Sequence, residues 1–271
     1  MSSLSFTLTR VWGIPIKLHV TLILLLPLFS HRFGLTIEAV IICAGVMASI
    51  VLHELGHSLV AIRKGCRVRE ILLTPIGGVA QMERIPSRPR DEFLMAIAGP
   101  LVSLALFFML DFAGDHMRPT FILQGVPFNV LTFLGMVNLG LVLFNMIPAF
   151  PMDGGRVLRA LLASRLGRLK ATFVASRLGR VFAVLFGGLG LYWMLESAQG
   201  LVLIFIAFFI FMAAGSEYRS VCAQEELQQA VYSSWRREPP PPHRAAGDDD
   251  VVISPPPFRE GPDSRSDIER M

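Results

Sequence analysis

Two histidines and a glutamate within one apolar segment form the group of residues best suited to chemistry. They are His53, Glu54 and His57, and they match the H-E-x-x-H pattern of zinc peptidases. Residues four apart lie on one face of a helix, so both imidazoles can bind a single metal ion, and Glu54 can reach a water that the metal activates. A catalytic zinc needs one more protein ligand and one open position, so a third ligand is expected elsewhere in the chain.

The composition places these ionisable groups inside a membrane. Of the 271 residues, 53% are hydrophobic and 17% are charged, and the mean hydropathy is +0.56, which is outside the range of soluble proteins. An ionisable side chain within a membrane span costs about 2 kcal/mol or more on insertion scales. Three such groups between residues 53 and 57 therefore favour a bound metal over a chance cluster or a hydrogen-bonded group in a helical bundle.

A second unusual segment, residues 145–155, offers the third ligand. Pro148 and Pro151 cannot continue a regular helix, and Gly154 permits tight backbone geometry, so Asp153 would be presented from a broken helix end. Irregular backbone at membrane depth is tolerated only where it faces protein or a water-filled cavity. The competing interpretation is that Asp153 only caps the helix that begins near Gly154.

The distribution of apolar runs predicts six membrane spans, because a helix needs roughly 20 apolar residues to cross a bilayer. The first span is weak, and the other five are clear. The expected spans cover residues 16–30, 38–62, 93–112, 129–148, 180–195 and 199–215.

Basic residues indicate how these spans are oriented. Residues 63–90 hold seven Lys or Arg and residues 156–180 another seven, and such loops stay on the cytoplasmic side, which predicts that both termini are cytoplasmic. His57 then lies about 9 Å from the inner boundary at Arg63, and Asp153 precedes Arg156 at the same boundary. This agreement in depth favours Asp153 as a metal ligand.

The polar end of the chain is expected to lack a fold of its own. We expect a membrane-embedded domain over residues 1–216 and a disordered cytoplasmic tail over residues 217–271, which is rich in proline and charge. The net charge of +4 comes from basic blocks between apolar runs, so no nucleic-acid partner is predicted.

The chain resembles the site-2 protease family of intramembrane zinc metalloproteases, in particular compact bacterial members similar to the sporulation protease that processes a sigma-factor precursor. The likeness covers most of residues 10–216. Besides the H-E-x-x-H pattern and the segment 145–155, it rests on WGIPIKLH at 12–19, on Gly77-Gly78 with Gln81-Met82, and on AGPL at 98–101.

The resemblance implies a polytopic all-α membrane fold whose second to fourth spans form a three-helix catalytic core. One Zn²⁺ per chain would be held by His53, His57 and Asp153, with Glu54 as the catalytic residue. The cell membrane is the expected location, and the expected substrate is a transmembrane protein in the lipid bilayer. A regulatory membrane partner that gates the site would also fit.

The resemblance further implies two substrate-binding elements. Gly77 and Gly78 would belong to a small β-like segment that dips into the membrane and pairs with an unwound substrate strand, although a turn in a cytoplasmic loop is an equal alternative. Asn145 would lie near the metal and contact the substrate or the developing oxyanion, unless it only forms a hydrogen bond between helices.

The expected function is that of an intramembrane zinc metalloendopeptidase, which hydrolyses peptide bonds in or near transmembrane segments. A membrane metal-handling or transport protein is the alternative, because intramembrane histidines also line ion paths. Transport, however, does not require Glu54 beside the first histidine. An inactive relative acting as a scaffold is a second alternative, against which all four expected metal-site residues are present.

Overall fold

The computed structural model describes residues 5–24, 37–74, 77–82, 88–117, 121–123, 126–195 and 199–237. The chain forms two compact units, Met1–Val221 and Cys222–Met271. The first unit holds every described strand and all helices up to the middle of the last one, and the second holds the end of that helix.

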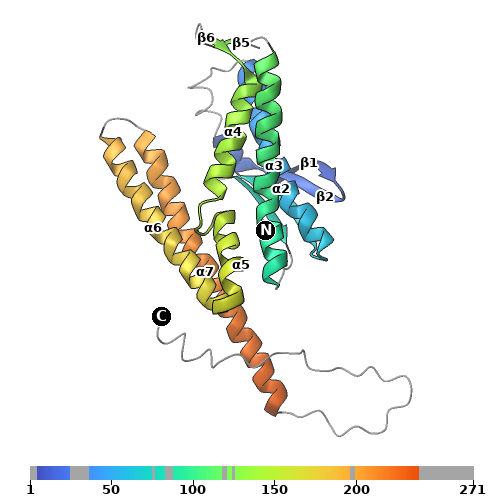
Figure 1. Cartoon of the computed structure of the whole chain (residues 1–271), viewed down its shortest axis with the longest axis vertical. Helices are drawn as coiled ribbons and strands as arrows, with labels where there is room; N and C mark the ends of the chain where they lie inside the picture. The colour runs from blue at the N-terminus through green and yellow to red at the C-terminus, as the bar shows by residue number, and fades with distance from the viewer. Residues whose placement is uncertain are drawn as a thin grey trace, which may run out of the picture. The chain divides into compact units, whose positions relative to one another are not determined.

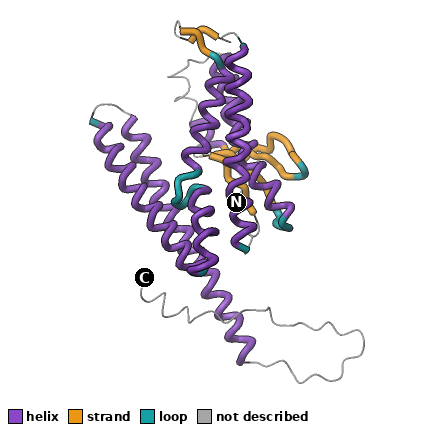
Figure 2. The backbone as a smooth tube through the Cα atoms, viewed as in Figure 1, coloured by secondary structure: helices purple, strands orange, loops and turns teal. Residues whose placement is uncertain are grey.

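Helices dominate the described residues (Figure 2). They comprise a short 3-10 helix η1 and six α-helices: η1 (Val20–Leu24), α2 (Ile37–Arg63), α3 (Pro89–His116), α4 (Val130–Asn145), α5 (Asp153–Leu166), α6 (Arg168–Met194) and α7 (Gln199–Arg237). Four of the described helices are long and apolar enough to cross a membrane, namely α2, α3, α6 and the 200–234 part of α7, and α4 is a shorter apolar helix. The predicted polytopic helical fold is thus confirmed.

The first predicted span is wrong where the structure describes it. Residues 16–19 belong to a strand, β2 (Ile14–His19), and residues 20–24 form η1, while residues 25–30 lie outside the described part. Ile14 and Ile16 are buried and alternate with more exposed neighbours, which is the period of a strand. Lys17 is partly exposed and pairs with Glu70 of the adjacent strand at 2.6 Å, so this segment forms a sheet rather than a span.

A four-stranded sheet lies beside the helices (Figure 1). Its strands stand in the order β1 (Ser5–Val11), β2, β3 (Val68–Thr74), β4 (Gly77–Met82), and a separate hairpin joins β5 (Phe121–Leu123) to β6 (Val126–Phe128). β2 and β3 are parallel, whereas the outer pairs are antiparallel. A parallel pair needs a long crossover connection, and the segment between β2 and β3 contains α2. The sheet is larger than the single β-like segment that was expected.

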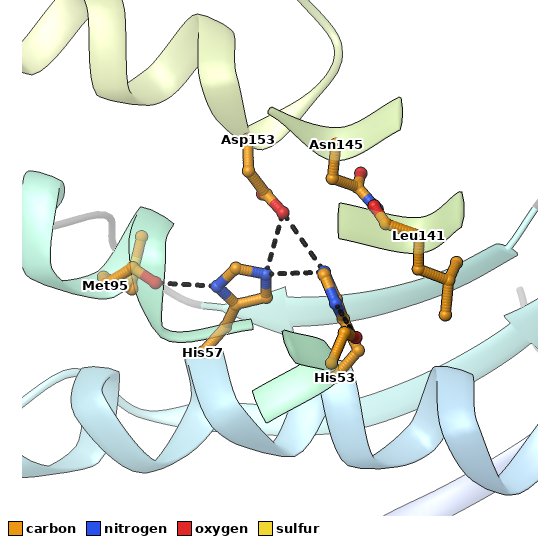
Figure 3. Close-up of polar contacts among 7 residues, drawn as sticks. His53, His57, Met95, Leu141, Asn145 and Asp153 are labelled. Atoms are coloured by element: carbon orange, nitrogen blue, oxygen red, sulfur yellow. Dashed lines mark hydrogen bonds and ion pairs between the residues drawn. The ribbon is translucent and has the colours of Figure 1, made fainter. Parts of the chain in front are cut away.

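The sheet packs on the metal-binding part of α2. Leu55, which lies between the two histidines, forms a buried cluster with Ile14 of β2 and Ile71 of β3. The burial of this apolar face fixes the rotation of α2, and the histidines contact Met95 of α3 and Asp153 of α5 (Figure 3).

Helices α2, α3 and α4 pack together as the expected three-helix core (Figure 1). A Cβ on Gly56 would lie only 2.8 Å from the carbonyl oxygen of Ala98, so α2 and α3 approach closely at the site. The buried Asn138 of α4 donates a hydrogen bond to Ser49 of α2 at 2.9 Å. Helix α5 then packs against α3 and α6.

The predicted disorder from residue 217 is wrong as far as residue 237, because α7 continues to Arg237. Residues 217–237 contain no glycine or proline and are rich in Glu, Gln, Ala and Arg, which favour helix. Residues 238–271 lie outside the described part, so the expectation for them stays a prediction, as does the domain boundary at residue 216.

Candidate metal centre

Helix α2 presents His53 and His57 on one buried face. Their relative exposures are 3% and 4%, and their rings meet edge to face with centroids 4.9 Å apart. The two Nε2 atoms are 3.2 Å apart. The four-residue spacing therefore brings both metal-binding nitrogens to one point, as the sequence pattern predicted.

Asp153 reaches the same point from the start of α5 (Figure 3). Its Oδ2 atom lies 3.2 Å from Nε2 of His53 and 3.1 Å from Nε2 of His57. The N-cap of α5 is Met152, and Asp153 is the next residue, so the aspartate is not simply the cap that the competing interpretation required. The three side chains are the only group of three or more His, Cys, Asp or Glu among the described residues that could share a metal ion.

The glycines after Asp153 allow this approach. A Cβ on Gly155 would lie 2.6 Å from the carbonyl carbon of Ala149, and one on Gly154 would collide with the carbonyl oxygens of Met146 and Ile147. The chain from α4 folds back tightly against the first turn of α5, and only glycine leaves room for it. This local geometry aims the Asp153 carboxylate at the histidines.

Helix α3 sets the orientation of both imidazoles. Nδ1 of His57 lies 2.7 Å from the carbonyl oxygen of Met95, and Nδ1 of His53 lies 2.9 Å from Oγ of Ser103. The Met95 carbonyl can only accept, so Nδ1 of His57 donates and Nε2 of the neutral ring keeps its lone pair. Gly99 lies between these contacts, and a Cβ there would lie 2.7 Å from Nε2 of His53 and overlap the ring of His57.

The donor set fits a zinc ion. Three acceptor atoms separated by 3.1 to 3.2 Å converge on one point, and the edge of a tetrahedron with metal–ligand distances near 2.0 Å is roughly 3.3 Å. If Nδ1 of His53 likewise donates to Ser103, all three atoms present lone pairs, which repel one another unless a cation lies between them.

Glu54 lies beside the ligands without joining them. Its side chain is partly exposed and extends toward β4, where a Cβ on Gly78 would lie 2.6 Å from Cγ of Glu54. Gly77 and Gly78 pair with Thr74 and Leu73 of β3, so they begin a strand rather than form a turn. The structure thus places the predicted glycine segment next to Glu54, and its role toward substrate stays a prediction.

Asn145 is the last residue of α4 and is half-buried. Its amide donates to the carbonyl oxygen of Leu141 in its own helix at 3.0 Å, and Figure 3 shows it on the same side of the histidines as Asp153. This hydrogen bond lies within α4 and does not join two helices, as the alternative interpretation required. Contact with substrate stays a prediction.

A buried ion network joins α5 to α3 and α7 and was not predicted. Arg159 of α5 is fully buried, and its guanidinium contacts Glu92 of α3 at 2.6 and 2.5 Å and Glu217 of α7 at 2.7 Å. It also stacks 4.8 Å above the ring of Phe150. The sequence shows only that Arg159 follows Asp153 by six residues. Its partners, Glu92 and Glu217, are distant from it in the sequence.

The comparisons with known proteins agree with this geometry. Residues 41–124 and 117–186 match the family described as Peptidase family M50. The solved structure of a site-2 protease from Methanocaldococcus jannaschii superposes with a TM-score of 0.61 at 38% identity, covering 79% of this chain and 95% of that chain. The chain belongs to peptidase family M50, and its resemblance to site-2 proteases is confirmed.

Two similar proteins are also named as zinc metalloproteases. A zinc metalloprotease of M. jannaschii is 40% identical over 222 residues, which is 80% of this chain and 61% of that protein. A putative zinc metalloprotease of Synechocystis is 36% identical over 68% of this chain and 48% of its own length. Stage IV sporulation protein FB of Bacillus subtilis is 29% identical over 72% of this chain and 67% of that protein. The chain thus spans about half to two thirds of these relatives. Together with the four candidate spans, the family makes it a membrane protein.

Proposed function

We propose that this chain is an intramembrane zinc metalloendopeptidase that hydrolyses peptide bonds in or near the transmembrane segments of membrane-protein substrates. The observation that carries the proposal is the convergence of three buried acceptor atoms, two from α2 and one from α5, within 3.1 to 3.2 Å of one another. Two imidazoles and one carboxylate leave a fourth position open, which is the ligand set of a catalytic rather than a structural zinc.

Each residue of the centre has a distinct role in this proposal. His53, His57 and Asp153 would hold the zinc, which supplies Lewis acidity toward a water molecule and a peptide carbonyl when bound. Glu54 accepts the proton of the attacking water and then delivers it to the leaving amine. Its position one residue after the first ligand, partly exposed beside β4, would leave the carboxylate free to act on a water at the metal rather than coordinate the ion.

The edge of the sheet supports a way to present the substrate. β4 is the last strand in the sheet order, and Gly78 at its start lies against Glu54. A helical substrate hides its carbonyls in hydrogen bonds, so it must unwind before attack. An unwound segment could then pair with β4 while Asn145 contacts the bond to be cleaved. The basic loops at residues 63–90 and 156–180 favour a site near the cytoplasmic face of the cell membrane.

The test is cleavage of a transmembrane substrate by the purified chain in detergent. Glu54→Gln removes the proton acceptor at nearly constant shape and should reduce cleavage by about 10²- to 10⁴-fold while zinc content is retained. Glu38→Gln, which makes the same change in the first turn of α2, is the matched control and should cleave normally. Full activity of Glu54→Gln would refute the proposed role, and wild-type protein that moves metal across vesicles without cleaving peptide would favour transport.

A further inference from the structure

Two arginine side chains from neighbouring helices converge on Gly215, where the apolar parts of α6 and α7 end. A Cβ placed on Gly215 would lie 3.3 Å from Nη2 of Arg180 and 3.5 Å from Nη1 of Arg219, with no other described atom outside its own helix within 4 Å. The two guanidinium nitrogens therefore lie within about 7 Å of each other, where like charges repel. The missing side chain of Gly215 leaves space between them.

These two cations have no acidic partner among the described residues. Glu217, two residues before Arg219, is bound to Arg159 instead. Nε of Arg180 is buried without a hydrogen-bond partner, and its guanidinium is held 5.8 Å from the ring centroid of Phe211. A positively charged pair that is held in place but lacks a counter-charge is suited to an anion from outside the chain.

The depth of Arg180 and Arg219 in the membrane indicates which anion is available to bind them. Residues 181–194 of α6 and 199–216 of α7 contain no charged residue, and these stretches are about 21 and 27 Å long. Both are somewhat shorter than the hydrocarbon core of about 30 Å, and a charge inside the core is costly, so we expect both arginines at its edge, where their guanidinium groups reach the headgroups. Phe173 and Tyr218 pack at the same end with centroids 5.6 Å apart, and tyrosine is typical of the membrane interface.

We propose that Arg180 and Arg219 bind the phosphate group of an anionic phospholipid between α6 and α7. Guanidinium groups bind phosphate oxygens through charge-assisted hydrogen bonds of about 2.8 Å, and one phosphate can bridge two groups at this separation. The helices are held close here, because Ser176 donates a hydrogen bond to the carbonyl oxygen of Ala214 at 2.6 Å. The site is thus organised before the lipid binds. The proposal does not depend on peptidase activity.

The test uses the full chain purified in detergent and measures phosphatidylglycerol binding by native mass spectrometry, with phosphatidylcholine as the zwitterionic comparison. Wild-type protein should prefer phosphatidylglycerol by about tenfold or more. Arg219 is exposed, so Arg219→Gln leaves the packing intact and should lose most of this preference. Arg165→Gln removes one exposed cation from α5 and serves as the matched control that retains it. Unchanged zinc content would show that both variants remain folded.

Three results would overturn the proposal. Equal binding of the two lipids by wild-type protein would show that no anionic site exists. If Arg165→Gln and Arg219→Gln lost the preference for phosphatidylglycerol equally, the preference would come from general attraction to the basic loops and not from a defined site. Displacement of phosphatidylglycerol by millimolar inorganic phosphate would assign the pair to a soluble phosphate rather than to a lipid.

Discussion

Replacement of Arg159 by methionine should destabilise the protein strongly. Arg159 is fully buried, and Glu92, at 2% exposure, lies 2.5 to 2.6 Å from its guanidinium. Removing one member of a buried ion pair leaves the other charge without compensation, which costs about 3–5 kcal/mol. For a domain of about 200 residues this corresponds to a fall of roughly 6–20 °C in the midpoint of thermal unfolding.

Two further variants separate charge from packing. The side chain of Glu217 is 27% exposed and meets one guanidinium nitrogen, so Glu217→Gln should cost less than about 2 kcal/mol. Changing Arg159 and Glu92 together to methionine removes both charges, and most of the lost stability should return. The assay is thermal unfolding at equal detergent concentration, followed by intrinsic fluorescence. An unchanged midpoint for Arg159→Met, or a double variant less stable than the single one, would refute this reasoning.

Two predictions concern the groups around the metal. Ser103→Ala removes the partner of Nδ1 of His53 and should weaken zinc affinity by about 10- to 100-fold in a chelator competition, and unchanged affinity would show that Ser103 does not orient the ring. Gly78→Leu introduces a side chain whose Cβ would lie 2.6 Å from Cγ of Glu54, so cleavage should fall sharply while zinc stays bound. Gly188→Leu, at an exposed helical glycine of α6 with no atom within 4 Å of its Cβ position, controls for a general effect of glycine replacement, and equal losses in both would contradict the contact with Glu54.

The metal-binding residues could be predicted from the sequence because their constraints are local. The four-residue spacing of His53 and His57 puts both on one face of a helix, and the prolines and glycines around Asp153 indicate a break in the helix. The basic loops further indicated that His57 and Asp153 lie at the same depth in the membrane. The convergence of these three side chains is what the structure shows, whereas the catalytic role of Glu54 and the substrate roles of Gly77, Gly78 and Asn145 remain proposals.

Contacts between distant parts of the chain were not accessible in this way. The carbonyl of Met95 carries no side-chain signal, and nothing in the sequence pairs Arg159 with Glu92. The stretch 16–30 is apolar enough to suggest a weak span, and only the pairing of residues 16–18 with β3 shows that its start is a strand. The helix over residues 217–237 was missed because its polar composition was taken for disorder, although it lacks helix-breaking residues.

The central claim is that two residues of α2 and one of α5 share a single zinc ion. The most direct measurement is the zinc content of the purified chain, by mass spectrometry of the metal, for the wild type and for Asp153→Ala. We expect one zinc per chain in the wild type and a large loss of zinc in the variant. Comparing the unfolding midpoints of the metal-free proteins would show whether the variant is still folded. A wild-type protein without zinc, or a variant that binds it as tightly, would contradict the account.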